Sequence, residues 1–169
     1  MERHGQATQL PYPPIRITKQ NKSYAQAMLD NMGGRVSEMS AVSLYFYNHL
    51  ITEKFPEVAE LFHKISVTEM RHLEIFGKLA CALGGNPRLW SSKPNGRHYW
   101  SPSYNTYSLE LPQLLKNAIQ SEKQAIEKYQ RQSEQIKDSN VVENLQRIIL
   151  DEMEHVELLT ACYHSITKG

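Results

Sequence analysis

The stretch PEVAELFHKISVTEMRHLEIFGKLACAL, residues Pro56 to Leu83, decides the fold of this chain. Its apolar residues recur at alternating steps of four and three, which is the pattern of a helix that buries one face against neighbouring helices. Glu69 and His72 fall on that buried face, where an unpaired charge is costly and ionisable groups are normally paired or bound to a metal. The positions concerned are Val58, Phe62, Ile65, Glu69, His72, Phe76, Leu79 and Leu83.

The same pattern returns near the C-terminus. Glu152 and His155 interrupt an apolar helical face at the Glu-x-x-His spacing already seen in Glu69 and His72. Two helices of this kind in one chain indicate a shared polar site in the core. From Val141, the steps select Leu145, Ile148, Glu152, His155, Leu159, Cys162 and Ile166.

Composition narrows the possible functions. The 169 residues are 40% hydrophobic and 22% charged, which fits one globular domain with a substantial core. The net charge is only +1 and the charges are interspersed, so neither nucleic acid nor a membrane surface is expected as a partner. The polar N-terminus and the lack of a long apolar run predict a cytoplasmic protein. Cys81 and Cys162 form no Cys-x-x-Cys pair, so we expect buried, reduced thiols and no rubredoxin-type iron site.

The chain divides into an N-terminal arm, residues 1–33, and a bundle domain, residues 34–169. Pro11, Pro13 and Pro14 predict an extended segment, followed by a short helix from Lys22 to Met32 that ends at two glycines. Long helices are then expected from about Val36 to Thr52, over Pro56 to Leu83, from an N-cap at Ser108, and from a turn at 138–140, with Asn140 and Glu143 as a capping box, to Ile166.

Residues 85–108 separate the second and third long helices and show no helical period. A helix as long as Pro56 to Leu83 spans on the order of 40 Å, and an extended segment of this size can run back along it. The third helix can therefore start at the far end and lie parallel to the second. We predict an all-α four-helix bundle with one long crossover, anchored by aromatic residues such as Trp90 and Trp100.

The two halves of the bundle repeat. Glu38-x-x-Ala41-x-x-x-Tyr45 in the first helix matches Glu122-x-x-Ala125-x-x-x-Tyr129 in the third, and a Glu-x-x-His helix follows each. Such a duplication brings four carboxylates and two imidazoles to one level of the core, a donor set that suits two iron or two manganese ions. Which two carboxylates bridge the metals is left open between the pairs Glu69/Glu152 and Glu38/Glu122. The predicted ligands are Glu38, Glu69, His72, Glu122, Glu152 and His155.

Glu69-Met70-Arg71-His72 and Asp151-Glu152-Met153-Glu154-His155 resemble the paired motifs of the ferritin-like superfamily, which includes bacterioferritins, rubrerythrins and manganese catalases. The resemblance implies that Asp151 orients a ligand histidine from outside the metal site. The repeat adds Tyr45 and Tyr129 as candidates for a similar supporting role. A weaker similarity, from Tyr12-Pro13 to Glu38, points to manganese catalases and their spore-coat relatives.

The sequence also departs from these families. Ala125 stands where rubrerythrins have a further Glu, and the fifth helix that helps to close ferritin shells is not expected. Met70 matches a haem-ligating position of bacterioferritins, but an ordinary helix-interface methionine is expected here and haem is not.

The leading hypothesis is an oxidoreductase, either a rubrerythrin-like peroxidase or a manganese catalase-like enzyme, that reduces or dismutates peroxide or dioxygen. A separate electron donor is needed unless the reaction is a dismutation, and a homodimer is the default assembly. One alternative is a ferroxidase that handles iron. Another is a structural, coat-type protein whose metals stabilise the fold. The buried Glu and His residues could also be ordinary core residues whose hydrogen bonds are satisfied.

Overall fold

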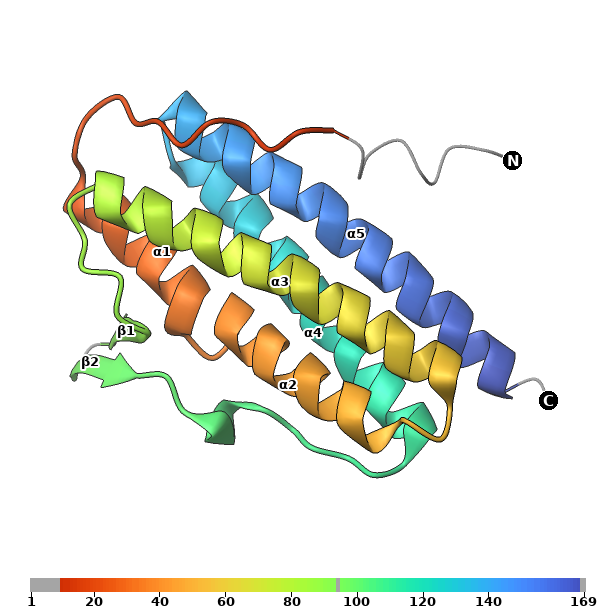
Figure 1. Ribbon diagram of the computed structural model, residues 1–169. Coiled ribbons are helices and arrows are strands. Elements are labelled where there is room, and N and C mark those ends of the chain that lie inside the picture. The colour runs from red at the N-terminus through yellow and green to blue at the C-terminus, as the bar shows by residue number, and fades with distance from the viewer. Residues whose placement is uncertain (1–9, 94, 168–169) are drawn as a thin grey trace.

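The computed structural model describes residues 10–93 and 95–167. Four long helices dominate it, and a short helix and a small hairpin flank them (Figure 1). In chain order, the elements are α1 (Lys22–Gly33), α2 (Glu38–Ile51), α3 (Pro56–Ala82), β1 (Trp90–Lys93), β2 (Gly96–Tyr99), a 3-10 turn (Pro102–Tyr104), α4 (Leu111–Gln135) and α5 (Ser139–Thr167).

The long helices form two antiparallel pairs, α2 with α3 and α4 with α5. Because the chain crosses the length of the bundle between α3 and α4, these two helices run in the same direction (Figure 1). The predicted all-α four-helix bundle with one long crossover is therefore confirmed. The boundary predicted between residues 33 and 34 falls in the turn between α1 and α2, and α1 packs against α3.

The helix ends follow local chemistry. The Ser37 hydroxyl caps α2 by accepting a hydrogen bond from the Ser40 amide, and Pro56 occupies the first turn of α3. The prediction of Ser108 as the cap of α4 is wrong. Its hydroxyl accepts from the Glu110 amide, and the helix starts afterwards at Leu111. At α5, Asp138 takes the capping position predicted for Asn140, because its carboxylate accepts from the Asn140 amide.

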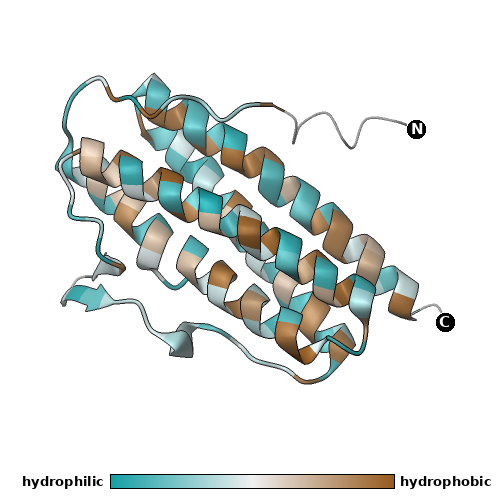
Figure 2. Cartoon of the chain, viewed as in Figure 1, coloured by the Kyte–Doolittle hydropathy of each residue, from teal (hydrophilic) through white to brown (hydrophobic). Residues whose placement is uncertain are grey.

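The core consists of two apolar clusters with a polar layer between them. One cluster joins α1 to the C-terminal half of α3 and the N-terminal half of α5, around Phe76 and Leu145. The other joins α2 to the opposite halves of α3 and α5, around Phe62 and Leu159. Apolar and polar residues alternate along each helix, as one-sided burial requires (Figure 2).

The crossover contains structure that the sequence analysis missed. β1 and β2 form an antiparallel hairpin in which Trp90 pairs with Tyr99 and Lys93 with Gly96. Beyond the hairpin, the crossover returns along α2 and not along α3. The Trp100 indole donates to the Ser40 hydroxyl at 3.0 Å, and the Asn105 amide donates to the Ser43 hydroxyl at 2.8 Å. The predicted anchoring by Trp100 is thus confirmed.

The N-terminal arm, residues 10–21, lies along the first half of α5 (Figure 1). The Arg147 guanidinium donates to the carbonyl oxygen of Leu10 at 2.9 Å, and the Thr18 amide donates to the Asp138 carboxylate at 2.6 Å. The part of the arm predicted for residues 1–9 lies outside the described residues. The arm therefore joins the bundle through polar contacts at both ends of its described length.

Three side chains lie in other surroundings than predicted. Both cysteines are free, but Cys81 is exposed and Cys162 only partly buried, because they lie toward the outer edge of their helices. Met70 is on the outer face of α3 with a 58% exposed side chain, so it is not within a helix interface of this chain.

Among the described residues, no helix has the length and apolar character needed to cross a membrane.

Candidate metal centre

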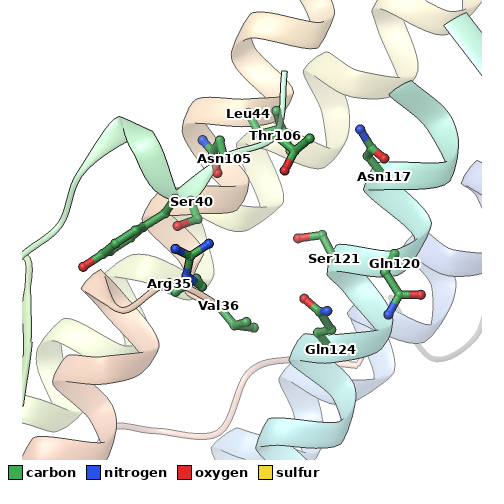
Figure 3. Close-up of a pocket in the computed structure, with 11 residues that line it drawn as sticks. Arg35, Val36, Ser40, Leu44, Asn105, Thr106, Asn117, Gln120, Ser121 and Gln124 are labelled. Carbon is green, nitrogen blue, oxygen red and sulfur yellow. The ribbon is translucent and has the colours of Figure 1, made fainter. Parts of the chain in front are cut away.

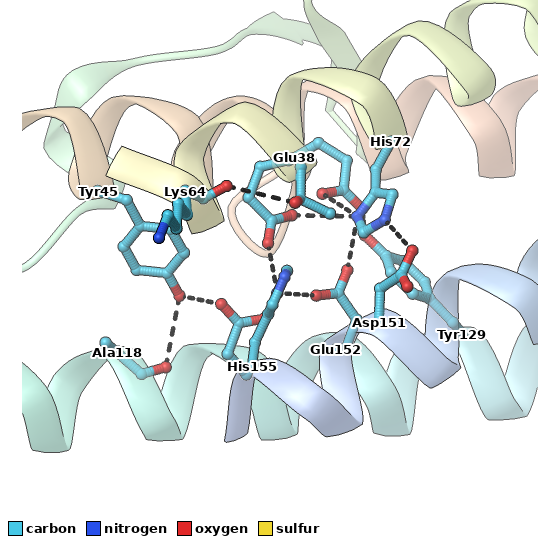
Figure 4. Close-up of polar contacts among 12 residues, drawn as sticks. Glu38, Tyr45, Lys64, His72, Ala118, Tyr129, Asp151, Glu152 and His155 are labelled. Carbon is cyan, nitrogen blue, oxygen red and sulfur yellow. Dashed lines mark hydrogen bonds and ion pairs between the residues drawn. The ribbon is translucent and has the colours of Figure 1, made fainter. Parts of the chain in front are cut away.

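All six predicted ligands lie together in the polar layer between the two apolar clusters (Figure 4). Each of the four long helices contributes one glutamate, and α3 and α5 each add a histidine. All six side chains are buried, and even His155 is only 5% exposed. The residues are Glu38 on α2, Glu69 and His72 on α3, Glu122 on α4, and Glu152 and His155 on α5.

The six residues form two overlapping groups, and each group could hold one metal ion. One consists of Glu38, Glu69, His72 and Glu152, and the other of Glu69, Glu122, Glu152 and His155. Within each group, one donor atom per residue lies within 4.8 Å of all the others. Glu69 and Glu152 belong to both groups, while Glu38 and Glu122 each belong to one.

Both histidines present Nδ1 to the carboxylates. His72 Nδ1 lies 3.3 Å from a Glu69 oxygen and 3.1 Å from a Glu152 oxygen. His155 Nδ1 lies 2.8 Å from the other Glu69 oxygen and 2.9 Å from the other Glu152 oxygen. Each of these two carboxylates therefore directs one oxygen toward each imidazole.

The donor set fits a pair of metal ions. Glu69 Oε1 and Glu152 Oε1 are fully buried without a hydrogen bond of acceptable geometry, although each has a histidine nitrogen within ion-pair distance. Buried carboxylate oxygens in this condition are costly unless a cation satisfies them. Carboxylate oxygens and imidazole nitrogens are the ligands that iron and manganese accept in proteins.

Each of the two repeated tyrosines donates a hydrogen bond to a carboxylate of the other helix pair. The Tyr45 hydroxyl, from α2, donates to Glu122 on α4, and the Tyr129 hydroxyl, from α4, donates to Glu38 on α2. Both rings are fully buried, and burial raises the pKa of each phenol well above its ordinary value. The two phenols therefore remain donors and fix one oxygen of each carboxylate.

Asp151 contacts His72 on the side away from the cluster. Its Oδ2 lies 3.0 Å from His72 Nε2 and also accepts a hydrogen bond of 2.6 Å from the Tyr12 hydroxyl. Arg147, one turn earlier on α5, donates to the other carboxylate oxygen at 2.5 Å. Sequence reasoning missed Tyr12 and Arg147. Arg147 could have been predicted as a partner of Asp151, because residues four apart on a helix are neighbours. Tyr12 could not, because the proline-rich arm has no periodic pattern that would place its side chain.

The electrostatics of the cluster depend on its carboxylates. Burial, reinforced by Glu152, raises the pKa of Glu69 well above its ordinary value, and burial raises that of Glu122 to about 7. Burial alone would lower the pKa of the histidines, but the charges of Glu152 at His72 and of Glu69 at His155 outweigh it and raise both well above the ordinary value. Without metal, the cluster therefore retains protons that a metal ion would displace.

Two pockets lie on opposite faces of the bundle. A pocket of about 280 Å³ between the arm, α3 and α5 is lined by His155 and Asp151, together with Tyr12 and Thr68. A pocket of about 290 Å³ opens between α2, the crossover and α4, where the labelled side chains of Ser121 and Gln124 face Arg35 and Val36 (Figure 3). Only the first pocket includes a member of the cluster.

Comparisons with known proteins agree with this arrangement. No curated protein sequence matches the chain. Two crystal structures of KatB, a manganese catalase from Anabaena, superpose with a TM-score of 0.85 each, at 22% and 21% identity. They cover 95% and 94% of this chain and 80% and 79% of the KatB chains, and at such identity the likeness shows the shared ferritin-like fold. Residues 35–163, which include all six clustered residues, match the rubrerythrin family. The chain belongs to the rubrerythrin family.

Proposed function

We propose that this protein holds two iron or two manganese ions in the cluster and uses them to reduce or dismutate peroxide or dioxygen. The observation that carries this proposal is the pair of overlapping donor groups that share Glu69 and Glu152. A single metal site would need only one such group. Four ionised carboxylates balance the formal charge of two divalent ions, so the buried charge is neutralised when both sites are filled.

The residues divide into three roles under this proposal. Glu69 and Glu152 would be shared by the two metal positions, since each faces both histidines. Glu38 with His72 and Glu122 with His155 complete one position each. Tyr129 and Tyr45 hold the two non-bridging carboxylates in place across the bundle.

The metals, when bound, supply the electrons exchanged with the O–O bond. The surrounding residues exclude bulk water from most of the centre, because the cluster is buried between two apolar layers. The pocket at His155 provides space for a small substrate next to the cluster. A molecule of the size of hydrogen peroxide or dioxygen fits in this pocket.

The assay that tests the proposal measures peroxide consumption and oxygen evolution by the metal-loaded protein, with and without a reductant. Oxygen evolution without reductant indicates dismutation, as in a catalase. Consumption only with a reductant indicates a peroxidase that uses a separate electron donor. Metal-loaded protein that consumes neither peroxide nor dioxygen under either condition, or turnover that persists after metal removal, contradicts the proposal. Rapid oxidation of ferrous iron with dioxygen as the preferred oxidant would instead favour the ferroxidase alternative.

A further inference from the structure

The two halves of the cluster differ in what supports their histidines from outside. On the His72 side, Asp151 contacts Nε2 at 3.0 Å and is itself held by Tyr12 and Arg147. The repeat places Thr68 at the corresponding position before Glu69, just as Asp151 precedes Glu152. The Thr68 hydroxyl donates to the carbonyl oxygen of Lys64 on its own helix, at 3.3 Å. The duplication therefore extends to the metal-binding groups but not to the acid behind them.

The N-terminal arm contributes to this difference between the surroundings of His72 and His155. Two guanidinium groups lie against the Tyr12 ring: the Cζ atom of Arg147 is 4.5 Å from the ring centroid and that of Arg71 is 5.6 Å from it. These cation–π contacts help to hold the ring with its hydroxyl directed at Asp151. The Tyr12 ring also meets the His72 imidazole edge-on, at 6.1 Å between centroids. Arg147 additionally binds the carbonyl oxygen of Leu10. A residue 60 positions before His72 thus completes the surroundings of that imidazole.

The opposite half opens to a pocket. His155 and Thr68 both line the pocket of about 280 Å³ beneath the arm, on the face where α3 and α5 meet. His72 has no part in the lining of this pocket. The imidazole of His155 therefore borders a surface pocket, which Asp151 and Tyr12 also line, whereas the imidazole of His72 is fully buried and in contact with the Tyr12 ring.

We propose that Tyr12 is a positioning residue that acts through Asp151, so that the metal ion on His72 is held firmly while the ion on His155 exchanges through the pocket. This inference rests on the proposed dinuclear centre. A hydrogen-bonded carboxylate behind a ligating histidine fixes the ring and increases its basicity, and loss of such an outer partner typically lowers metal affinity by roughly 10- to 100-fold.

The test measures metal release from full-length protein that is loaded with Mn²⁺ and then mixed with excess EDTA. Electron paramagnetic resonance of Mn²⁺ follows the release, and elemental analysis after desalting gives the metal that remains bound. We expect two kinetic phases of equal size, one ion leaving quickly and one slowly. Tyr12→Phe keeps the ring and its contacts with the two arginines and removes the hydroxyl. It should accelerate the slow phase roughly tenfold and leave the fast phase unchanged.

Two further variants make the test specific. Tyr24→Phe removes another tyrosine hydroxyl, one that accepts from the Lys137 amide far from the cluster, and should alter neither phase. Thr68→Asp installs an acid at the position equivalent to Asp151 and should slow the fast phase. A Tyr12→Phe protein in which both phases change equally, or neither changes, overturns the inference.

The outcomes separate this inference from the proposed function. Wild-type protein that binds two Mn²⁺ ions and releases both in a single phase overturns the inference and leaves the dinuclear centre intact. Protein that cannot bind two ions overturns both. Circular dichroism of each variant at the assay temperature verifies that faster release does not reflect unfolding.

Discussion

At the scale of single residues, Glu69 and Glu152 differ from the other carboxylates of the cluster because each faces both histidines. Glu38 and Glu122 each have a tyrosine hydroxyl as a fixed partner, whereas one oxygen of Glu69 and one of Glu152 lack a hydrogen bond. These two residues therefore depend most on a bound cation. Substituting either residue should weaken metal binding, but only Glu69, whose pKa burial raises, should be replaceable without loss of metal-free stability. The reason is that, at Glu152, burial is outweighed by the charges of the two histidines, which lower the pKa of this carboxyl.

The variants Glu69→Gln and Glu152→Gln test this difference. Each keeps the side-chain volume and removes one bridging charge, so bound metal should fall below two ions per chain and peroxide turnover by about 100-fold or more. The metal-free Glu69→Gln protein should be at least as stable as wild type, because burial already raises the pKa of this carboxyl. Metal analysis and thermal unfolding measure both effects. Glu74→Gln, on the exposed side of α3, is the matched control, and equal metal loss there would contradict the assignment.

The raised pKa values also predict how metal-free stability depends on pH. Glu69, Glu122, His72 and His155 all have a raised pKa in the folded chain, from ordinary values of 4.5 for Glu and 6.5 for His. Their protonated forms stabilise the fold below the ordinary pKa, and this contribution is lost as the pH rises through the folded pKa. The lowered pKa of Asp151 acts in the opposite sense, but only at acidic pH.

Thermal unfolding of the metal-free protein should therefore occur at progressively lower temperature as the pH rises from about 6 to about 8.5. Added Mn²⁺ should raise the unfolding temperature more at the upper end, because fewer protons compete for its ligands. The Mn²⁺-loaded protein is the control and should vary less, because the atoms that bind the metal carry no protons. A metal-free unfolding temperature that is constant or rises over this range would contradict the protonation scheme.

Sequence reasoning identified the residues of the cluster but not all their pairings. Helical spacing placed Glu69 and His72 on one face, since residues three apart project together. Each tyrosine donates a hydrogen bond to a carboxylate of the other helix pair. This pairing depends on how the helices pack against one another, which the residue spacing within one helix cannot predict. Tyr12 lies in a segment without periodicity, so only the folded chain reveals its contact with Asp151.

At the scale of elements, α1 and the crossover hairpin meet at Gly33. A Cβ atom at this position would lie 2.7 Å from the carbonyl carbon of Leu89 and 2.7 Å from the nitrogen of Trp90. Both are backbone atoms, which cannot yield without moving the hairpin. The close approach places the end of α1 directly before the turn that positions Glu38.

We expect Gly33→Ala to destabilise the fold by about 1–3 kcal/mol, the usual cost of overpacking. Gly77→Ala is a matched comparison within α3, where the new methyl group would meet only the flexible end of Met32, at 3.3 Å. Because alanine favours helix by roughly 0.5–1 kcal/mol over glycine, this variant should be neutral or more stable. Chemical denaturation of both proteins measures the difference. Equal stability of the two variants would show that the contact at Gly33 is unimportant.

The helices and strands could be predicted only where their apolar residues recur with a regular period. The short helix from Lys22 and the helix from Pro56 were predicted close to their observed bounds because apolar spacing and a helix-starting proline define them. The hairpin was not predicted, since residues 90–99 are too short and too polar to show strand alternation. The start of α4 was misplaced because Ser108 caps a turn two residues before the helix.

At the scale of the whole molecule, the duplication of a helix pair, α2–α3 and α4–α5, explains why a polar layer is tolerated between two apolar cores. Each core holds four helices together at one end of the bundle, and the layer between them receives a carboxylate from every helix. The duplication was visible in the sequence and predicted the fold correctly. The asymmetry that Tyr12 of the arm introduces was not visible, because it depends on a contact between distant segments.

The most direct test of the dinuclear centre is an anomalous difference map from crystals of the protein loaded with Mn²⁺. We expect two peaks per chain in the polar layer. One should lie beside His72 and Glu38, the other beside His155 and Glu122, with carboxylate oxygens of both Glu69 and Glu152 within ligand distance of each. A single peak, or no peak among these residues in fully folded protein, would contradict the dinuclear centre and with it the proposed chemistry.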